Sequence, residues 1–310
     1  MSCSFCESEA VIFAREYEGV KLCSSCFRQS VEDKVRRTIS KRRMLKPNDH
    51  VAVAVSGGKD SLTLLSILKK LETRFPRARL TAVTVDEGIH GYRDEALRLA
   101  SDLCSKLGVD LVAVSFEELY GITTDELVSR ERKLTPCSYC GVFRRKAINY
   151  GAAKARATKI ATAHNLDDEV QTVLLNLLHG DVFRLARASP VLEDPRGRFL
   201  PRIKPLCEVP EREVALYAYL SGLEFQSNAC PHGDEALRGD IRTMLNRLEE
   251  KHPGMKFTLF HSAEKLRALL ENAVPWKELR TCQRCGDPTS QEICEGCKML
   301  ESVVGPQMPV

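Results

Sequence analysis

The sequence predicts an α/β protein whose centre is a doubly wound parallel sheet. Short, apolar, β-branched runs recur along the chain, and amphipathic helical stretches separate them. A glycine-rich turn directly follows the first of these runs and precedes a helical pattern. Alternation of strands and helices in this way favours parallel strands that are joined by crossover helices. The expected strands lie at 51–55, 80–86, 110–115 and 159–163.

The helices between and after these strands carry their own stop signals. Residues 93–108 show an amphipathic pattern that ends at Gly108, a residue suited to the left-handed conformation after a helix. Residues 235–251 and 261–272 are two further helical stretches. The region that follows the sheet is therefore expected to be mainly helical.

Composition bounds the class of protein and its surroundings. The 310 residues are 43% hydrophobic and carry a net charge of +4, which allows one main core and permits an RNA partner without proving one. The chain opens without an apolar signal segment, and no apolar run of about eighteen residues could span a bilayer. Thirteen cysteines then fit metal-bound thiolates in a reducing, cytoplasmic compartment better than disulfides of a secreted protein.

The sequence is expected to divide into a main domain with smaller parts on both sides. The predicted parts are a four-cysteine module at 1–28, a basic linker helix at 29–48, the main α/β domain at 49–225, a helical region at 226–278, and a second four-cysteine module with a tail at 279–310.

Two sets of four cysteines have the spacing of zinc knuckles, CSFC with CSSC and CQRC with CEGC. Each set can close a tetrahedral zinc site and thereby fold a segment that is too small for a core of its own. The expected ligands of two zinc ions are Cys3, Cys6, Cys23, Cys26, Cys282, Cys285, Cys294 and Cys297.

A basic helix is predicted after the first cysteine set. Its six cations from Lys34 to Arg43 suit RNA phosphates, although such charge runs are usually solvated faces.

The turn after the first strand is a predicted phosphate cradle. Glycines allow backbone amides to approach phosphate oxygens, and the start of the next helix adds partial positive charge. The spacing differs from that of the Walker P-loop, so an ordinary P-loop NTPase is disfavoured. The expected nucleotide-binding residues are Ala54, Ser56, Gly57, Gly58, Lys59, Asp60 and Ser61.

This SGGKDS turn resembles the SGGxDS signature of the PP-loop ATP pyrophosphatases, whose fold is of the adenine nucleotide alpha hydrolase-like type. The resemblance implies that ATP is cleaved between its α and β phosphates and that the substrate is adenylylated. It also implies functional roles for Lys59 and Asp60, and it places Asp86, at the end of the second strand, beside the nucleotide. An acidic residue after a strand is also often only a turn former.

A polar segment follows the strand at 159–163. Carboxylates at this edge of the sheet could hold the magnesium ion that accompanies ATP, or they could merely cap the next helix. The segment resembles the GHNxDD element of tRNA-thiolating PP-loop enzymes, which favours the magnesium role. The expected site residues here are Ala163, His164, Asp167 and Asp168.

Three further cysteines, Cys137, Cys140 and Cys230, are one short of a closed zinc site. A cubane cluster held by three cysteines keeps one iron open for another ligand. The sequence leaves two alternatives open: a persulfide-carrying pair of thiols, and a structural zinc with His232 as the fourth ligand. Arg144, one helical turn after the pair, is a candidate phosphate contact.

The motif PCSYCG with two arginines downstream, together with a later Cys-Pro element, resembles the archaeal and thermophile tRNA 2-thiouridine synthases and their eukaryotic cytosolic relatives. The resemblance covers nearly the whole chain, including both terminal cysteine modules. It implies a 4Fe-4S cluster on Cys137, Cys140 and Cys230. It also implies a homodimer, and a ubiquitin-like sulfur carrier with a C-terminal thiocarboxylate as the donor.

The predicted activity is therefore ATP-dependent tRNA-uridine 2-sulfurtransfer, in which the uridine C2 oxygen is adenylylated and sulfur then replaces it. The element GDVFRL resembles the wobble-uridine branch of this family, and the resemblance slightly favours the wobble uridine over the T-loop uridine. The alternatives are a cytidine thiolase, a PP-loop RNA-modifying ligase, a thiolase that uses a persulfide without a cluster, and a non-catalytic RNA-binding zinc protein. The last would leave SGGKDS and HNLDD without a role.

Overall fold

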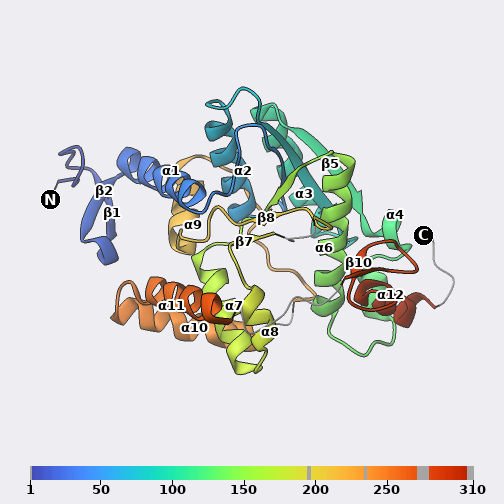
Figure 1. Ribbon diagram of the computed structural model, residues 1–310. Coiled ribbons are helices and arrows are strands. Elements are labelled where there is room, and N and C mark those ends of the chain that lie inside the picture. Colours follow the sequence, from blue (N-terminus) through green and yellow to red (C-terminus); the bar gives the residue numbers. More distant parts are fainter. Residues whose placement is uncertain (1, 194–196, 234–235, 271–278, 306–310) are drawn as a thin grey trace.

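The computed structural model describes residues 2–193, 197–233, 236–270 and 279–305 (Figure 1). Within these residues the centre of the molecule is a six-stranded sheet in the order β5-β4-β3-β6-β8-β7. The first five strands of this order run parallel, and only β7 pairs antiparallel with its neighbour. The strands are β3 (His50–Ala54), β4 (Arg79–Asp86), β5 (Asp110–Ser115), β6 (Lys159–Ala161), β7 (Val191–Leu192) and β8 (Arg202–Ile203). The predicted α/β class with a mainly parallel sheet is confirmed.

Both faces of the sheet are covered because alternate residues of each strand enter different cores. Val51 and Val53 of β3 pack with α2 (Lys59–Glu72), whereas Ala52 packs with the far side of the sheet. On that far side lies α6 (Pro136–Lys154), so close that a methyl group on Gly151 would stand 2.5 Å from a methyl of Val83. Burial on both faces explains why the strands are continuously apolar.

The remaining helices complete the two layers around the sheet. Helix α3 ends at Gly108, which has the expected left-handed backbone with φ of 61°. The helices of the central and helical regions are α3 (Arg93–Leu107), α4 (Phe116–Tyr120), α5 (Thr124–Ser129), α7 (Leu166–Leu178), α8 (Val182–Arg187), α9 (Glu211–Leu220), α10 (Ala236–Lys251) and α11 (Met255–Leu270). None of the helices in the described ranges is long and apolar enough to cross a membrane.

The N-terminal part is a hairpin of β1 (Val11–Arg15) and β2 (Val20–Cys23), with the short helix η1 (Glu16–Glu18) at its turn and α1 (Ser24–Lys41) after it. Figure 1 shows this part at one end of the molecule. The predicted boundary between residues 28 and 29 falls inside α1, since the second cysteine pair spans the start of that helix. The hairpin is anchored to α9 by a buried ion pair of 2.8 Å between Arg15 and Glu213.

The cations of α1 and the turn after it are not all available to a partner. Lys34 is buried and pairs with Glu18 at 3.2 Å, and Arg42 pairs with Glu208 at 2.6 Å. These two of the six predicted phosphate contacts therefore hold the fold together. Arg36, Arg37, Lys41 and Arg43 remain exposed.

The C-terminal part packs on α6. It consists of a small antiparallel pair, β9 (Arg280–Thr281) and β10 (Pro288–Thr289), and of α12 (Glu295–Val304). Met299 and Leu300 of α12 enter the same apolar cluster as Phe143 of α6. The second predicted helical stretch, 261–272, includes residues 271 and 272, which lie outside the described residues. The part of the expected tail beyond residue 305 also lies outside them.

Candidate active site

The SGGKDS turn joins β3 to α2 as the sequence predicts. The hydroxyl groups of Ser56 and Ser61 lie 3.2 Å apart, and the Ser61 hydroxyl also donates to the Gly58 carbonyl at 2.9 Å. Gly58 is the N-cap of α2 and offers no side chain to cap it. The first amides of the helix are thus left for an anionic ligand, and the helix dipole adds to the attraction.

Gly57 is required by the path of the chain at this turn. Its φ is +86°, and a Cβ atom would lie 2.5 Å from the backbone oxygen of Ala96 in α3. Its carbonyl also accepts a hydrogen bond of 3.0 Å from the Gln226 amide. The turn is therefore fixed between α3 and the segment that follows α9.

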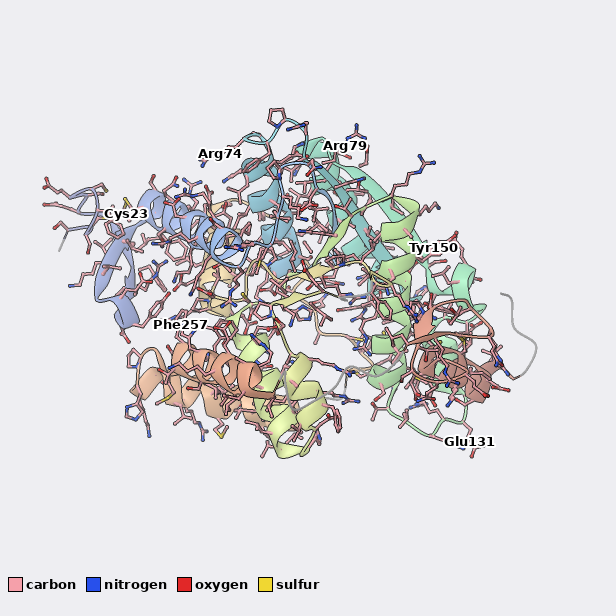
Figure 2. The ribbon with its side chains drawn as sticks, viewed as in Figure 1. Cys23, Arg74, Arg79, Glu131, Tyr150 and Phe257 are labelled. Atoms are coloured by element: carbon pink, nitrogen blue, oxygen red, sulfur yellow. The ribbon has the colours of Figure 1, made fainter. Side chains whose placement is uncertain are left out.

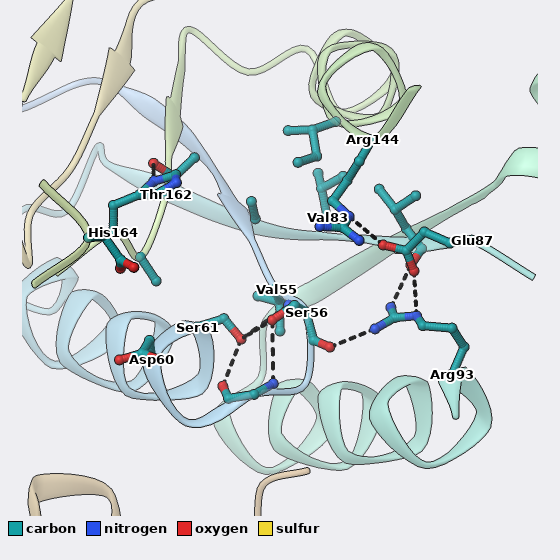
Figure 3. A pocket seen from close by; sticks show the side chains of 16 residues that line it. Val55, Ser56, Asp60, Ser61, Val83, Glu87, Arg93, Arg144, Thr162 and His164 are labelled. Carbon is teal, nitrogen blue, oxygen red and sulfur yellow. Dashed lines mark hydrogen bonds and ion pairs between the residues drawn. The ribbon is translucent and has the colours of Figure 1, made fainter. Parts of the chain in front are cut away.

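The turn opens into a cavity of about 270 Å³, shown in Figure 3. Its walls come from the carboxyl ends of β3, β4 and β6, the edge at which open α/β sheets bind ligands. Most of the predicted nucleotide-binding residues line it, namely Ala54, Ser56, Gly58, Asp60, Ser61, Arg144, Ala163, His164 and Asp168. Lys59 lies next to it and pairs with Asp60 at 2.8 Å and with Glu211 at 2.9 Å.

Two carboxylates, Asp60 in the first turn of α2 and Asp168 in the first turn of α7, line this cavity. Asn165 joins them, since its side-chain amide donates to Asp60 at 3.0 Å and it forms a reciprocal capping box with Asp168 at the start of α7. Burial raises the pKa of Asp168 to about 6, and the negative charges of Asp60 and Glu211 act in the same direction. Carboxylates that repel each other beside a phosphate cradle are a donor set suited to magnesium.

Two of the predicted acidic residues are used differently. Asp167 is turned away from the cavity and binds Lys256 and the Glu211 amide, the latter at 2.8 Å. Asp86 accepts a hydrogen bond of 2.9 Å from the Gly88 amide, the turn-forming role that the sequence left open. Neither is among the described residues that line the cavity.

The opposite wall carries an ion-pair network that the sequence did not predict. Glu87 is 3% exposed and bridges Arg93 at 2.6 Å and Arg144 at 2.5 Å (Figure 3). Arg93 donates in turn to the carbonyl of Ser56 at 2.8 Å. The only sign of Glu87 in the sequence was that it is an acidic residue directly after Asp86 at the end of a predicted strand. Its spacing did not distinguish it from an ordinary turn residue.

The three remaining predicted ligands come from two distant segments. Cys137 and Cys140 lie in the first two turns of α6, which begins at Pro136 after the Thr135 cap. Cys140 accepts a hydrogen bond of 3.2 Å from Arg144, while burial raises the pKa of its thiol. The charge of Cys230 acts on the same thiol and the same guanidinium, so the later segment meets this end of α6.

The position of His232 argues against a closed zinc site at this place. Its Nε2 lies 2.6 Å from Asp125, whereas its carbonyl oxygen, not its ring, lies 3.7 Å from Cys137 Sγ. Among the described residues, the three cysteines do not form a group with all ligand atoms within 4.8 Å. A cubane, whose irons lie between the sulfurs, suits this wider spacing better than a single ion does.

The two terminal cysteine sets are tightly gathered. Each brings four sulfur atoms within 4.8 Å of one another, in the groups that the sequence predicts. The separation of Sγ atoms is 3.6 Å for Cys6 and Cys23, and 3.6 Å for Cys285 and Cys294. Zinc–sulfur bonds of about 2.3 Å in a tetrahedron separate the sulfurs by about 3.8 Å. Both sets therefore have the dimensions of a zinc site.

Comparison with known proteins agrees with this geometry. A family model described as a PP-loop domain matches residues 28–249. The tRNA 2-thiolation protein NcsA of Haloferax volcanii is 39% identical over 98% of this chain and 99% of its own length. The chain belongs to the PP-loop tRNA 2-thiolation family. The sequence-based assignment to this family is confirmed.

Other members of the family show the same extent of similarity. Cytoplasmic tRNA 2-thiolation protein 1 of Aspergillus niger is 38% identical over 97% of this chain and 88% of its own length. The solved structure of the U34-tRNA thiolase NcsA from Methanococcus maripaludis, with its [4Fe-4S] cluster, superimposes with a TM-score of 0.85 at 34% identity. It covers 96% of this chain and 95% of the neighbour. The similarity thus extends over nearly the whole chain.

Proposed function

We propose that this member of the family is an ATP-dependent tRNA sulfurtransferase that makes 2-thiouridine and holds a 4Fe-4S cluster on Cys137, Cys140 and Cys230. The observation that carries the proposal is the contact between the two halves of the site: Arg144 lines the nucleotide cavity and donates to Cys140 at 3.2 Å. An activated uridine in the cavity is then close to the cysteines that would deliver sulfur.

The phosphate loop is proposed to hold the triphosphate of ATP. The uncapped amides of α2 and the side chains of Ser56 and Ser61 donate to phosphate oxygens, and Lys59 neutralises charge on departing pyrophosphate. A magnesium ion between Asp60 and Asp168 would offset the repulsion of these two carboxylates. Asp167, a predicted magnesium ligand, pairs with Lys256. This pairing supports Asp60, rather than Asp167, as the second carboxylate ligand of magnesium beside Asp168.

The three-cysteine site, defined as Cys137, Cys140 and Cys230, fits a cluster because it offers three thiols from two segments and no closed fourth position. When bound, a cluster with three cysteine ligands supplies an open iron that can carry sulfide. The chain's own contribution is orientation: α6 fixes two thiols, and the Asp125–His232 pair of 2.6 Å fixes the segment of the third. The solved NcsA structure with its cluster supports this arrangement.

The substrate position is proposed to be the wobble uridine. The solved neighbour that covers 96% of this chain is a U34-tRNA thiolase, and the GDVFRL element of this chain favours the same branch. The two terminal sites are proposed to hold structural zinc, supported by their sulfur separations of 3.6 to 3.9 Å. Four protein ligands leave no open position for catalysis at either zinc.

The remaining partners follow from the family resemblance. We propose a homodimer, a cytoplasmic location, and sulfur delivery by a ubiquitin-like carrier with a C-terminal thiocarboxylate. Exposed apolar side chains at the end of α7 and in α8 support self-association, since Leu178 is 65% and Phe183 53% exposed. Light scattering of the purified chain would show a mass of two chains if the dimer proposal holds.

The decisive experiment is anaerobic reconstitution with iron and sulfide, followed by metal analysis and tRNA thiolation with ATP. The wild type is expected to hold about four irons per chain beyond its zinc. Cys230→Ala is expected to lose the iron and the activity while it keeps ATP binding. Cys104→Ala is a matched control, because this buried thiol lies in the core among α2 and α3 and faces no predicted ligand.

Three other outcomes would redirect the proposal. Thiolation by the iron-free protein would favour a persulfide on Cys137 or Cys140. ATP consumption that depends on tRNA but leaves no sulfur in it would favour a ligase. Sulfur found on cytidine would move the chain to the cytidine thiolases.

A further inference from the structure

A second cavity, of about 560 Å³, lies far from the phosphate loop along the strand direction. It is formed by α1, the loop after α1, the end of α2 and the loop before β4. Val51 and Leu80, at its base, are paired residues near the starts of β3 and β4. Because the phosphate loop follows the end of β3, this cavity opens at the opposite edge of the sheet. Its floor is aliphatic and consists of Ile39, Leu45, Val51, Leu68, Leu71 and Leu80.

The rim of this cavity is strongly cationic. The six cations of the rim are all exposed, and they are Arg36, Arg37, Arg43, Lys46, Arg74 and Arg79. Arg36 pairs with Asp33 at 3.0 Å, and the other five have no ion-pair partner among the described residues. Figure 2 shows Arg74 and Arg79 together on this edge of the molecule, at the top of the view.

The two acidic residues of the cavity do not balance this charge. Asp49 is buried and pairs with Lys159 at 3.0 Å, and Glu72 pairs with Lys69 at 2.7 Å. Five unpaired cations around one opening repel one another, so their charges lower the stability of the free chain. An anionic partner would relieve this repulsion.

The side chains of the rim indicate which anion fits. Five of the six cations are arginines, whose planar guanidinium matches phosphate oxygens in a bidentate manner. At the mouth, Phe75 is 46% exposed and offers a ring on which a base can stack above the aliphatic floor. Arginines beside an exposed aromatic ring are the combination that binds unpaired nucleotides of RNA.

We propose that this cavity is a second tRNA-binding site, in which the rim arginines hold phosphates of one RNA segment and Phe75 stacks on an unpaired base. The proposal rests on the proposed function, since it takes the RNA of that function as the ligand. It assigns the contact to the edge of the sheet opposite the phosphate loop, which carries no part of the reaction. The site anchors the RNA by charge and stacking while the uridine occupies the phosphate-loop edge.

The test measures binding of total tRNA to the full chain at several salt concentrations. Arg37→Ala with Arg74→Ala, drawn from two different elements, is expected to reduce the slope of log affinity against log salt by about 0.7 to 0.9 for each phosphate that is no longer neutralised. Phe75→Ala is expected to weaken binding about 5- to 100-fold without changing that slope. Phe75→Tyr keeps an aromatic ring and is expected to restore most of the affinity.

Arg77→Ala is the matched control, because it removes one exposed cation from the same loop but does not line the cavity. ATP binding is expected to stay at the wild-type level in all these variants, which shows that the phosphate-loop edge is intact. Unchanged affinity and slope in the arginine pair would overturn the inference, as would a loss equal to that of the control. Rim variants that lose binding to an acidic protein partner but keep tRNA would assign the cavity to that partner and equally overturn it.

The outcome is separable from that of the proposed function. A wild-type chain that thiolates tRNA while every cavity variant binds RNA normally keeps the function and removes this site. A wild-type chain that binds no tRNA removes both.

Discussion

Arg144 Nη2 lies 3.2 Å from Sγ of Cys140, and this contact connects the nucleotide cavity with the three-cysteine site. The same guanidinium pairs with Glu87 at 2.5 Å, and Glu87 pairs with Arg93, which binds the carbonyl of Ser56 in the phosphate loop. A single chain of charged groups therefore runs from the loop to the cysteine. Glu87 acts as a positioning residue in this chain because it touches neither end directly.

Replacement of Glu87 tests this relationship. Glu87→Ala leaves Arg93, whose side chain is 6% exposed, without its carboxylate, so the free energy of unfolding is expected to fall by about 3 kcal/mol. Asp102→Ala is the control, because it removes an exposed partner of Arg98. It should change the free energy of unfolding by less than about 1 kcal/mol. Urea unfolding measures both.

A second readout separates positioning from stability alone. Glu87→Asp keeps the charge, and after reconstitution and reduction it should retain more of the electron paramagnetic resonance signal of the proposed cluster than the isosteric, neutral Glu87→Gln does. If the neutral variant retained the wild-type spectrum, Glu87 would be a structural residue without influence on the cysteine site.

Gly57 should tolerate no side chain. Gly57→Ala combines the cost of a positive φ, about 1 to 2 kcal/mol, with a collision against the backbone of Ala96, for an expected loss of about 2 to 5 kcal/mol in stability. Gly108 has a similar φ of +61° but open space around it. Gly108→Ala should therefore lose only about 1 to 2 kcal/mol, the cost of a positive φ. Calorimetry of ATP binding is expected to show loss in the Gly57 variant alone, and equal behaviour of the two variants would contradict the close approach of α3.

The sequence predicted those parts of the site that local spacing encodes. The SGGKDS turn needs a strand before it and a helix after it, and both are visible as apolar periodicity. Each four-cysteine set is likewise contained in fewer than thirty residues. Local pattern was therefore enough for the strands β3, β4, β5 and β6, the cradle and the two terminal cysteine groups. It did not predict β7 and β8, which have only two residues each and show no apolar periodicity.

Contacts between distant segments were not predictable in the same way. Asp167 and Asp168 are neighbours with the same chemistry, and only the arrival of Lys256 from α11 turns one of them away from the cavity. Glu87 gains its role from Arg144, which is 57 residues away along the chain. The cationic face of α1 also looked uniform, yet its pairing with Glu18 and Glu208 depends on the folded arrangement.

Lys146 should strengthen metal binding at the proposed C-terminal zinc site. Its Nζ lies 3.2 Å from Cys285 Sγ and 3.6 Å from Cys294 Sγ, so it offsets the negative charge that four thiolates bring to one zinc ion. Lys146→Ala is expected to lower zinc affinity at this site about 10-fold or more, and Lys146→Arg to restore part of it. Zinc release to a chelator measures the change.

The proposed N-terminal zinc site serves as the internal control for this measurement, because Lys146 makes no contact with its cysteines among the described residues. One zinc per chain should be released faster in Lys146→Ala and the other at the wild-type rate. Equal release rates in wild type and variant would show that the lysine only packs against the module.

The pH dependence of magnesium-dependent ATP binding should reveal Asp168. Burial raises the pKa of this carboxyl to about 6, and only the deprotonated form can hold a divalent cation. Affinity for ATP with magnesium is therefore expected to rise as the pH increases through about 6, by up to about tenfold per unit below that value. Asp168→Asn removes the titrating group, so the ratio of the wild-type affinity to the variant affinity isolates the contribution of Asp168 from the titration of ATP itself.

A measurement without magnesium is the control. The pH dependence of ATP affinity should then reverse, because the deprotonated carboxylate repels the phosphates. A ratio that stays constant across this range would exclude Asp168 as a magnesium ligand and leave it only the capping box with Asn165.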